Sequence, residues 1–179
     1  NHLRIEKKNI LVIFSEGFSS RWIHEYSGKF PELTPSLNDI YKRSYVIDNY
    51  FNHTAATFRG LRGQMLSVFQ KSEVPAMKGD EFKANFDFKS PIQALKRNGY
   101  KNYFFLSQQG KLNELLETMH FDNVYGKNAL KKKGRKVVVL SDEELFDGVL
   151  KTLQEKNSNN EKFFAAVYNF DTHNGLDSN

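Results

Sequence analysis

Three side chains suited to metal and phosphate chemistry stand where loops adjoin apolar runs. Glu16 comes soon after the run Asn9–Phe14, Thr57 opens a helical stretch, and His173 follows the run Lys162–Phe170. Hard divalent cations prefer carboxylate oxygen, and a cation bound to a hydroxyl oxygen favours the alkoxide. Glu16 and Thr57 can therefore share one metal ion, which lets a poor nucleophile attack phosphorus or sulfur. His173 can hydrogen-bond a leaving group or a head group.

Each of these residues also has an ordinary interpretation. Glu16 reads as a solvated loop residue and His173 as a partly exposed loop histidine. Thr57 reads as a helix N-cap, a role worth about 1 kcal/mol. A helix that begins at Thr57 would also direct N–H groups and a positive dipole at a phosphoryl oxygen, with Arg59 nearby. Because all three residues occupy loops where ligands are expected, the set favours a functional site.

Apolar runs alternate with amphipathic stretches along the chain, which predicts an α/β fold of three α/β/α layers around a mainly parallel sheet. Ligands of such sheets bind beyond the carboxyl ends of the strands. Ser141 and Glu144 form a capping box that begins a long helix. We expect strands at Lys8–Phe14, Tyr45–Phe51, Tyr100–Leu106, Phe121–Tyr125 and Lys162–Phe170. We expect helices from Pro35, over Thr57–Phe69, from Pro91 to Asn98, over Lys111–Met119 and from Ser141 to Leu153, with a loop over Glu73–Lys89.

The composition narrows the class of protein. A chain of 179 residues with 39% hydrophobic residues can bury one domain-sized core. The absence of cysteine excludes disulfides, Cys-ligated zinc and thiol nucleophiles. The net charge of +5 includes the basic run Lys131–Lys136, which is either a solvated loop or a site of attraction to an anionic surface. No groove-reading motif accompanies this charge, so we expect no nucleic-acid partner. The chain opens on Asn1 rather than Met, and we expect it to be a piece of a longer protein.

Several short motifs, taken in order, resemble one known family. The motifs are Asn9–Glu16, Leu33–Leu37, Thr57–Gly60, Leu140–Phe146 and Phe163–His173. Together they resemble the opening of a sulfatase-type domain of the alkaline phosphatase superfamily. Lipoteichoic acid synthases and phosphoglycerol transferases are the branch that the chain resembles most. The resemblance covers nearly the whole chain, and the order and spacing of the motifs carry it.

The resemblance implies a site and a reaction. Glu16 and Thr57 would be metal ligands, Thr57 the nucleophile that forms a phospho-threonine intermediate, and His173 a substrate contact. The metal would be Mn²⁺, with Zn²⁺ or Mg²⁺ as alternatives. The donor would be an anionic phospholipid and the acceptor a glycan or a glycerol phosphate. The family also implies an extracytoplasmic domain of a bacterial cell membrane protein, tethered through segments outside this chain.

The resemblance also implies an incomplete site. Residues 1–179 would form the N-terminal portion of one catalytic domain, because the family completes its metal site with a downstream Asp-His pair that this chain lacks. Formylglycine sulfatases require a C/S-x-P-x-R motif, which is absent here. Two alternatives stay open beside the transferase. One is a phosphodiesterase or sulfatase-like hydrolase on the same scaffold, and the other is an inactive domain that binds anionic lipid or glycan.

Overall fold

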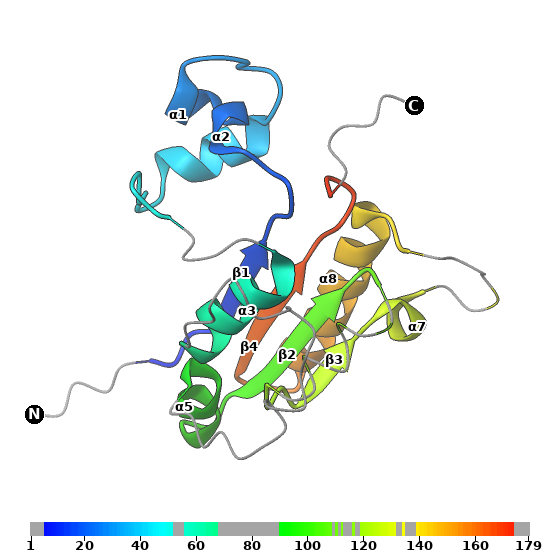
Figure 1. Ribbon diagram of the computed structural model, residues 1–179. Helices are drawn as coiled ribbons and strands as arrows, with labels where there is room; N and C mark the ends of the chain where they lie inside the picture. Colours follow the sequence, from blue (N-terminus) through cyan, green and yellow to red (C-terminus); the bar gives the residue numbers. More distant parts are fainter. Residues whose placement is uncertain are drawn as a thin grey trace, which may run out of the picture.

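A parallel sheet of four strands organises the chain in the computed structural model, with the order β1-β4-β2-β3 (Figure 1). The structure describes residues 6–51, 56–67, 90–108, 119–131 and 139–173, with the single positions 110, 112, 116 and 134. Because the strands are parallel, their carboxyl ends share one edge of the sheet. The strands are β1 (Ile10–Phe14), β2 (Lys101–Leu106), β3 (Asn123–Tyr125) and β4 (Phe163–Tyr168).

Strand β4 is the most deeply placed of these strands. All six of its residues are buried, and it pairs with β1 on one side and β2 on the other. The registers set Phe14 of β1 and Leu106 of β2 beside Tyr168, the last residue of β4. A continuous apolar run is typical of a parallel strand covered on both faces, as this run is.

Helices cover both faces of the sheet, which confirms the predicted three-layer α/β fold (Figure 1). Leu61 and Met65 of α3 (Thr57–Leu66) and Ile92 of α5 (Pro91–Arg97) pack with Phe104 and other side chains of one face. Side chains of the long helix α8 pack against the opposite face, near the short helix α7. Helix α8 spans Asp142–Ser158, and α7 spans Lys127–Leu130.

A small helical segment follows β1 and stands away from the sheet at the end to which β1 points (Figure 1). It contains a 3₁₀ turn η1 (Ser20–Trp22), α1 (His24–Ser27) and α2 (Pro35–Lys42). Its centre is the buried Asn38, whose Oδ1 accepts from the His24 N–H at 2.9 Å and whose Nδ2 donates to the Pro31 carbonyl at 3.3 Å.

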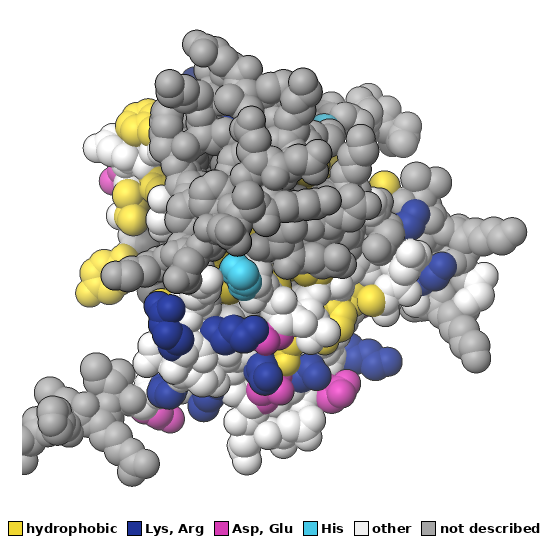
Figure 2. Space-filling view, turned by 60° about the horizontal axis from the view of Figure 1, so that its bottom comes forward, with side chains coloured by type: hydrophobic (Ala, Val, Ile, Leu, Met, Phe, Trp, Pro, Cys, Tyr) yellow, Lys and Arg dark blue, Asp and Glu magenta, His cyan; other side chains and the backbone are white. Residues whose placement is uncertain are grey.

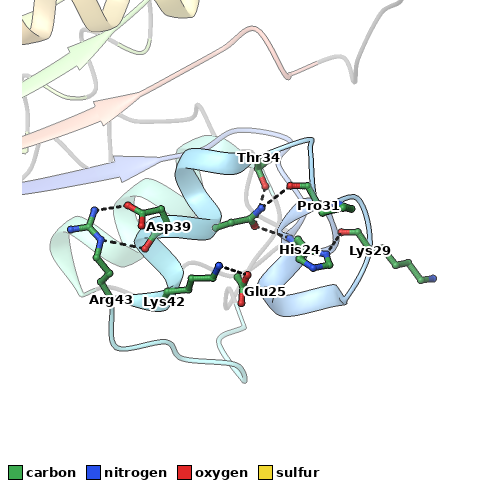
Figure 3. Close-up of polar contacts among 9 residues, drawn as sticks. His24, Glu25, Lys29, Pro31, Thr34, Asp39, Lys42 and Arg43 are labelled. Carbon is green, nitrogen blue, oxygen red and sulfur yellow. Dashed lines mark hydrogen bonds and ion pairs between the residues drawn. The ribbon is translucent and has the colours of Figure 1, made fainter.

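Two ion pairs reinforce this segment on its surface, and Figure 3 shows them beside the hydrogen bonds. Lys42 pairs with Glu25 at 3.1 Å, and Arg43 pairs with Asp39 at 2.9 Å. Thr34 precedes α2 as predicted, but its hydroxyl donates to the Trp22 carbonyl instead of capping the helix. Contacts within the segment therefore stabilise it. In the sequence, the segment lies between Glu16 and Thr57.

One predicted strand is wrong. Tyr45–Phe51 forms no strand, and Asp48 and Asn49 form a turn in its middle. Tyr45, Ile47 and Phe51 are exposed, so the run packs no face against the sheet. Asp and Asn favour turns because their side chains hydrogen-bond the local backbone, and here that preference prevails over the apolar pattern.

The other predicted elements agree with the structure wherever it describes them. The Ser141–Glu144 capping box is present at the start of α8. Helix α3 ends at Leu66, before the expected limit, and Ser67 follows in the left-handed region at φ 56°. Glu73–Lys89, most of Lys111–Met119 and most of the basic run Lys131–Lys136 lie outside the described residues. No helix of the described part is both long and apolar enough to cross a bilayer.

Lysine and arginine side chains gather at the amino-end edge of the sheet, which faces the viewer in Figure 2. Exposed Lys101 begins β2, exposed Lys162 precedes β4, and Lys96 at the end of α5 pairs with Asp122 at 2.9 Å. Six strand residues separate this edge from the carboxyl ends, a length of about 20 Å. These cations therefore contribute little direct charge at Glu16.

Candidate active site

Glu16 and Thr57 meet beyond the carboxyl end of β1, as predicted. The Thr57 hydroxyl donates to Glu16 Oε2 at 3.4 Å. A third oxygen joins them, because the Tyr168 hydroxyl donates to the same Glu16 Oε2 at 2.5 Å and lies 3.2 Å from Thr57 Oγ1. The loop after β1, helix α3 and strand β4 thus bring three oxygen atoms to one point.

Thr57 is not the N-cap of α3. It is the first helical residue, and Ala56 occupies the cap position without a side-chain hydrogen bond. Ala56 has φ 71° and ψ 140°, a conformation that costs a non-glycine residue about 1–3 kcal/mol. This backbone places the Thr57 hydroxyl toward Glu16 instead of toward the first turn of the helix. The ordinary N-cap interpretation is therefore wrong.

The loop after β1 is held by the loop after β4. Asn169 Oδ1 accepts from the Glu16 N–H at 2.8 Å, and Asn169 Nδ2 donates to Asp142 Oδ2 at 2.7 Å. Asp142 Oδ1 also accepts from the N–H groups of Phe170 at 3.0 Å and Asp171 at 3.2 Å. The N-terminus of α8 therefore positions the loop after β4, and that loop positions the Glu16 backbone.

The same two loops touch through their backbones. Thr172 donates its hydroxyl hydrogen to the Glu16 carbonyl. Gly17 has φ 62°, and a β-carbon added there would lie 2.2 Å from the Thr172 carbonyl oxygen. Only glycine fits this approach, so the Glu16 loop and the His173 loop form one unit.

His173 lies near the three oxygens, in the loop that follows β4. The His173 ring packs on the Phe170 ring at a centroid distance of 4.5 Å, and the His173 backbone N–H donates to the Phe170 carbonyl at 2.9 Å. It lines the same pocket as Glu16 and Thr57. The structure thus brings all three predicted residues to one pocket, with His173 on its rim.

This pocket has a volume of about 500 Å³, and it is lined by polar residues on one part and apolar residues on another. Glu16, Thr57, Tyr168 and His173 supply polar groups, and Gln64 lies farther along α3. The apolar part is formed by Phe14, Phe58 and Leu61. A charged ester group and an apolar neighbouring group can therefore be accommodated side by side.

Burial raises the pKa of the Tyr168 hydroxyl well above its usual value, and donation to Glu16 raises it further. The contact with Thr57 opposes this shift. Tyr168 is consequently a neutral hydrogen-bond donor at neutral pH.

The oxygens of Glu16 and Thr57 suit one hard divalent cation. The two oxygens are 3.4 Å apart, close enough for both to be ligands of one cation. Within the described ranges, no three His, Asp or Glu side chains cluster to complete a site. Asp171 is engaged elsewhere, accepting from the Asp142 N–H at 2.7 Å. The described part of the chain therefore supplies part of a cation site.

Sequence reasoning missed Tyr168, Asn169 and Asp142. Tyr168 ends an apolar run and was read as core, and Asp142 was read only as part of the capped helix start. The polar residue Asn169, directly after the buried strand, was the one available signal. Their roles depend on strand order and register, which the sequence pattern does not specify.

Comparison with known proteins agrees with this fold. The model of the family named Sulfatase matches residues 8–179. The chain belongs to the sulfatase family. Members of the wider sulfatase and alkaline phosphatase superfamily generally depend on divalent metals. No curated protein sequence matches the chain.

Two solved structures share the fold of this sulfatase-family chain. The lipoteichoic acid synthase LtaP from Listeria monocytogenes matches with a TM-score of 0.77 and 19% identity over 93% of the chain. A protein in the alkaline phosphatase superfamily from Vibrio parahaemolyticus matches with a TM-score of 0.77 and 18% identity over 94% of the chain. The chain spans 41% of the length of each structure. At this identity the matches establish the fold alone.

Proposed function

We propose that this chain forms part of a metal-dependent transferase that moves a phosphoglycerol-type group from a lipid donor through a phospho-threonine intermediate. The main support is the hydrogen bond of 3.4 Å from the Thr57 hydroxyl to Glu16 Oε2. This contact lies at the carboxyl ends of the strands in a chain of the sulfatase family. The shared fold with a lipoteichoic acid synthase supports the choice of phosphodiester chemistry over sulfate ester chemistry.

The residues present would perform the attack as follows. A bound divalent cation, Mn²⁺ in our proposal with Zn²⁺ or Mg²⁺ as alternatives, would favour the alkoxide of Thr57 and screen the anionic donor. Thr57 Oγ1 bonds to phosphorus while the ester bond to the lipid alcohol breaks. The Thr57 hydroxyl lies 3.4 Å from Glu16 Oε2, to which it donates, and 3.2 Å from the Tyr168 hydroxyl. The proton that Thr57 gives up leaves with the lipid alcohol. An acceptor hydroxyl then attacks phosphorus and releases Thr57.

His173 and the apolar wall would hold the donor during this step. His173 on the pocket rim can hydrogen-bond the head group or the leaving alcohol. Phe14, Phe58 and Leu61 lie beside Thr57 in the same pocket and suit the glycerol and ester carbons of a phospholipid. An anionic phospholipid donor and a glycan or glycerol-phosphate acceptor are therefore our proposed substrates.

We place residues 1–179 in the N-terminal portion of one catalytic domain, and we propose that a downstream Asp-His pair completes the cation site. The length of the chain relative to the two matching structures supports this placement. We further propose that the domain works at the extracytoplasmic face of a bacterial membrane. That location would bring the pocket to a lipid donor.

The nucleophile is tested by Thr57→Ala in the whole protein that contains this chain, assayed with phosphatidylglycerol and a glycerol-phosphate acceptor. We expect turnover to fall at least a thousandfold while thermal unfolding changes little. Thr152→Ala is the matched control, because Thr152 lies on α8 and donates to the Gly148 carbonyl at 2.9 Å. Mass spectrometry of acid-quenched enzyme should detect the glycerophosphoryl group on the Thr57 peptide. Undiminished turnover in Thr57→Ala would reject the assignment.

The products of the same assay separate the proposal from its alternatives. Transfer to the acceptor supports the transferase. Free glycerol phosphate without an acceptor adduct would instead identify a hydrolase on the same scaffold. An absence of both products, together with no heat of divalent-metal binding in calorimetry, would leave an inactive domain that binds anionic lipid or glycan.

A further inference from the structure

The Tyr168 hydroxyl contacts both Glu16 and Thr57. It donates to Glu16 Oε2 at 2.5 Å and lies 3.2 Å from Thr57 Oγ1. The tyrosine ends β4 and is only 4% exposed, with strands β1 and β2 on either side. Its ring is therefore fixed by the sheet, whereas the Glu16 side chain rises from a loop.

We propose that Tyr168 is a positioning residue that sets the Glu16 carboxylate and the Thr57 hydroxyl at the separation one divalent cation requires. This inference rests on the proposed function, because it assigns to Glu16 and Thr57 the role of cation ligands. Tyr168 would act through these two residues and would not itself be a cation ligand.

The hydrogen bond is compatible with cation binding. A carboxylate oxygen has two lone-pair directions, so Glu16 Oε2 can accept from Tyr168 and still face a cation. Carboxylate ligands of metals are usually held by such a second hydrogen bond, and its removal typically weakens metal binding 10–100-fold. Two backbone bonds fix the Glu16 main chain, from its N–H to Asn169 and from Thr172 to its carbonyl. The side chain beyond them depends on Tyr168.

The structure contains a matched control for this bond. Tyr103 on β2 is 3% exposed and donates its hydroxyl hydrogen to Glu161 near the amino-end edge of the sheet. Tyr103→Phe therefore removes a bond between a buried tyrosine and a glutamate, as Tyr168→Phe does, but far from the cation site. A general loss of stability would affect both variants, and a loss of positioning would affect only Tyr168→Phe.

The test is the Mn²⁺ dissociation constant of the whole protein, measured by calorimetry for wild type, Tyr168→Phe and Tyr103→Phe. We expect binding to weaken 10–100-fold in Tyr168→Phe and to stay within twofold of wild type in Tyr103→Phe. Unchanged binding in Tyr168→Phe would overturn the inference. Tighter binding would also overturn it, because the tyrosine would then occupy the place of the cation.

A double-mutant cycle tests whether Tyr168 acts through Glu16. The effect of Tyr168→Phe on Mn²⁺ affinity should shrink to less than threefold in a Glu16→Gln background, because contacting residues are not additive. An equal effect in both backgrounds would refute positioning through Glu16. A wild-type protein that binds no divalent metal would reject the proposed function and this inference together. Weakened binding in Tyr168→Phe without any transfer activity would support the inference and reject only the proposed reaction.

Discussion

The contact between the loops that follow β1 and β4 can be tested by adding one carbon atom. Gly17 has φ 62°, and the β-carbon of Gly17→Ala would lie 2.2 Å from the Thr172 carbonyl oxygen. That separation is about 1 Å shorter than an ordinary contact, and the obstacle is backbone, so one loop must move. The movement would break the hydrogen bond from the Thr172 hydroxyl to the Glu16 carbonyl.

The expected cost follows from two contributions. A residue with a β-carbon in the left-handed region costs about 1–2 kcal/mol relative to glycine. Loss of the Thr172 hydrogen bond costs about 1 kcal/mol more. We therefore expect Gly17→Ala to lower the free energy of unfolding by about 2–3 kcal/mol in urea titrations. It should also weaken Mn²⁺ binding, because Glu16 moves with its loop.

Gly28→Ala separates these two contributions. Gly28 has φ 69°, and a β-carbon added there meets nothing within 4 Å among the described residues. It therefore carries the conformational cost without the collision, and we expect a loss of about 1–2 kcal/mol with unchanged Mn²⁺ affinity. Equal losses in the two variants would refute the close contact between the loops.

Three further substitutions test the elements that support the site. Asn169→Ala removes bonds to the Glu16 N–H and to the Asp142 carboxylate, so we expect urea titration to show a loss of about 2–4 kcal/mol. Ser141→Ala removes the capping hydroxyl of α8 and should cost about 1 kcal/mol by thermal unfolding. Burial opposes ionisation of Asp122, but hydrogen bonds from the Asn102 N–H and from a lysine lower its pKa below the usual value. Stability from Asp122 is thus present above its unfolded pKa and lost as pH falls toward its folded pKa, so the deficit of Asp122→Asn should shrink as pH falls below about 4.

Each of these three predictions has an outcome that contradicts it. A loss below 1 kcal/mol in Asn169→Ala would mean that the bridge between the two loops carries little free energy. An unchanged melting temperature in Ser141→Ala would show that the capping box does not stabilise α8. A deficit of Asp122→Asn that does not shrink as pH falls below about 4 would show that the lost free energy is not linked to ionisation.

The sheet was predictable because its strands obey a simple pattern. The runs that became β1 and β4 are both continuously apolar. Strand β4 is buried on both faces, as such a run predicts, whereas β1 at the end of the strand order leaves Leu11 and Ile13 exposed. Tyr45–Phe51 has a similar composition but failed as a strand, since the Asp48-Asn49 turn divides it and no neighbour pairs with it among the described residues. Local composition predicts whether a segment favours extended backbone. Hydrogen bonding to a neighbouring strand decides whether that segment becomes a β-strand.

The candidate site was predictable only in part, for a related reason. Glu16 and Thr57 were found because polar residues at strand ends and helix starts are recognisable without knowing which strands are neighbours. Tyr168 was not found, because its role requires that β4 lie beside β1 in the register that pairs Phe14 with Tyr168. A tyrosine at the end of an apolar run is ordinary core until a partner for its hydroxyl is known.

The strand order makes the site depend on the part of the described chain that is farthest from Glu16 in sequence. Strand β4 lies between β1 and β2, and it is followed at once by Asn169 and the Thr172–His173 turn. Glu16 thus receives its backbone bond and its side-chain bond from residues 153 and 152 positions away. Contacts of such long sequence separation slow folding in general, because they require the closure of a long loop. Any chain that ends before β4 would keep Glu16 and Thr57 but lose every bond from β4 and its following loop that orients the glutamate.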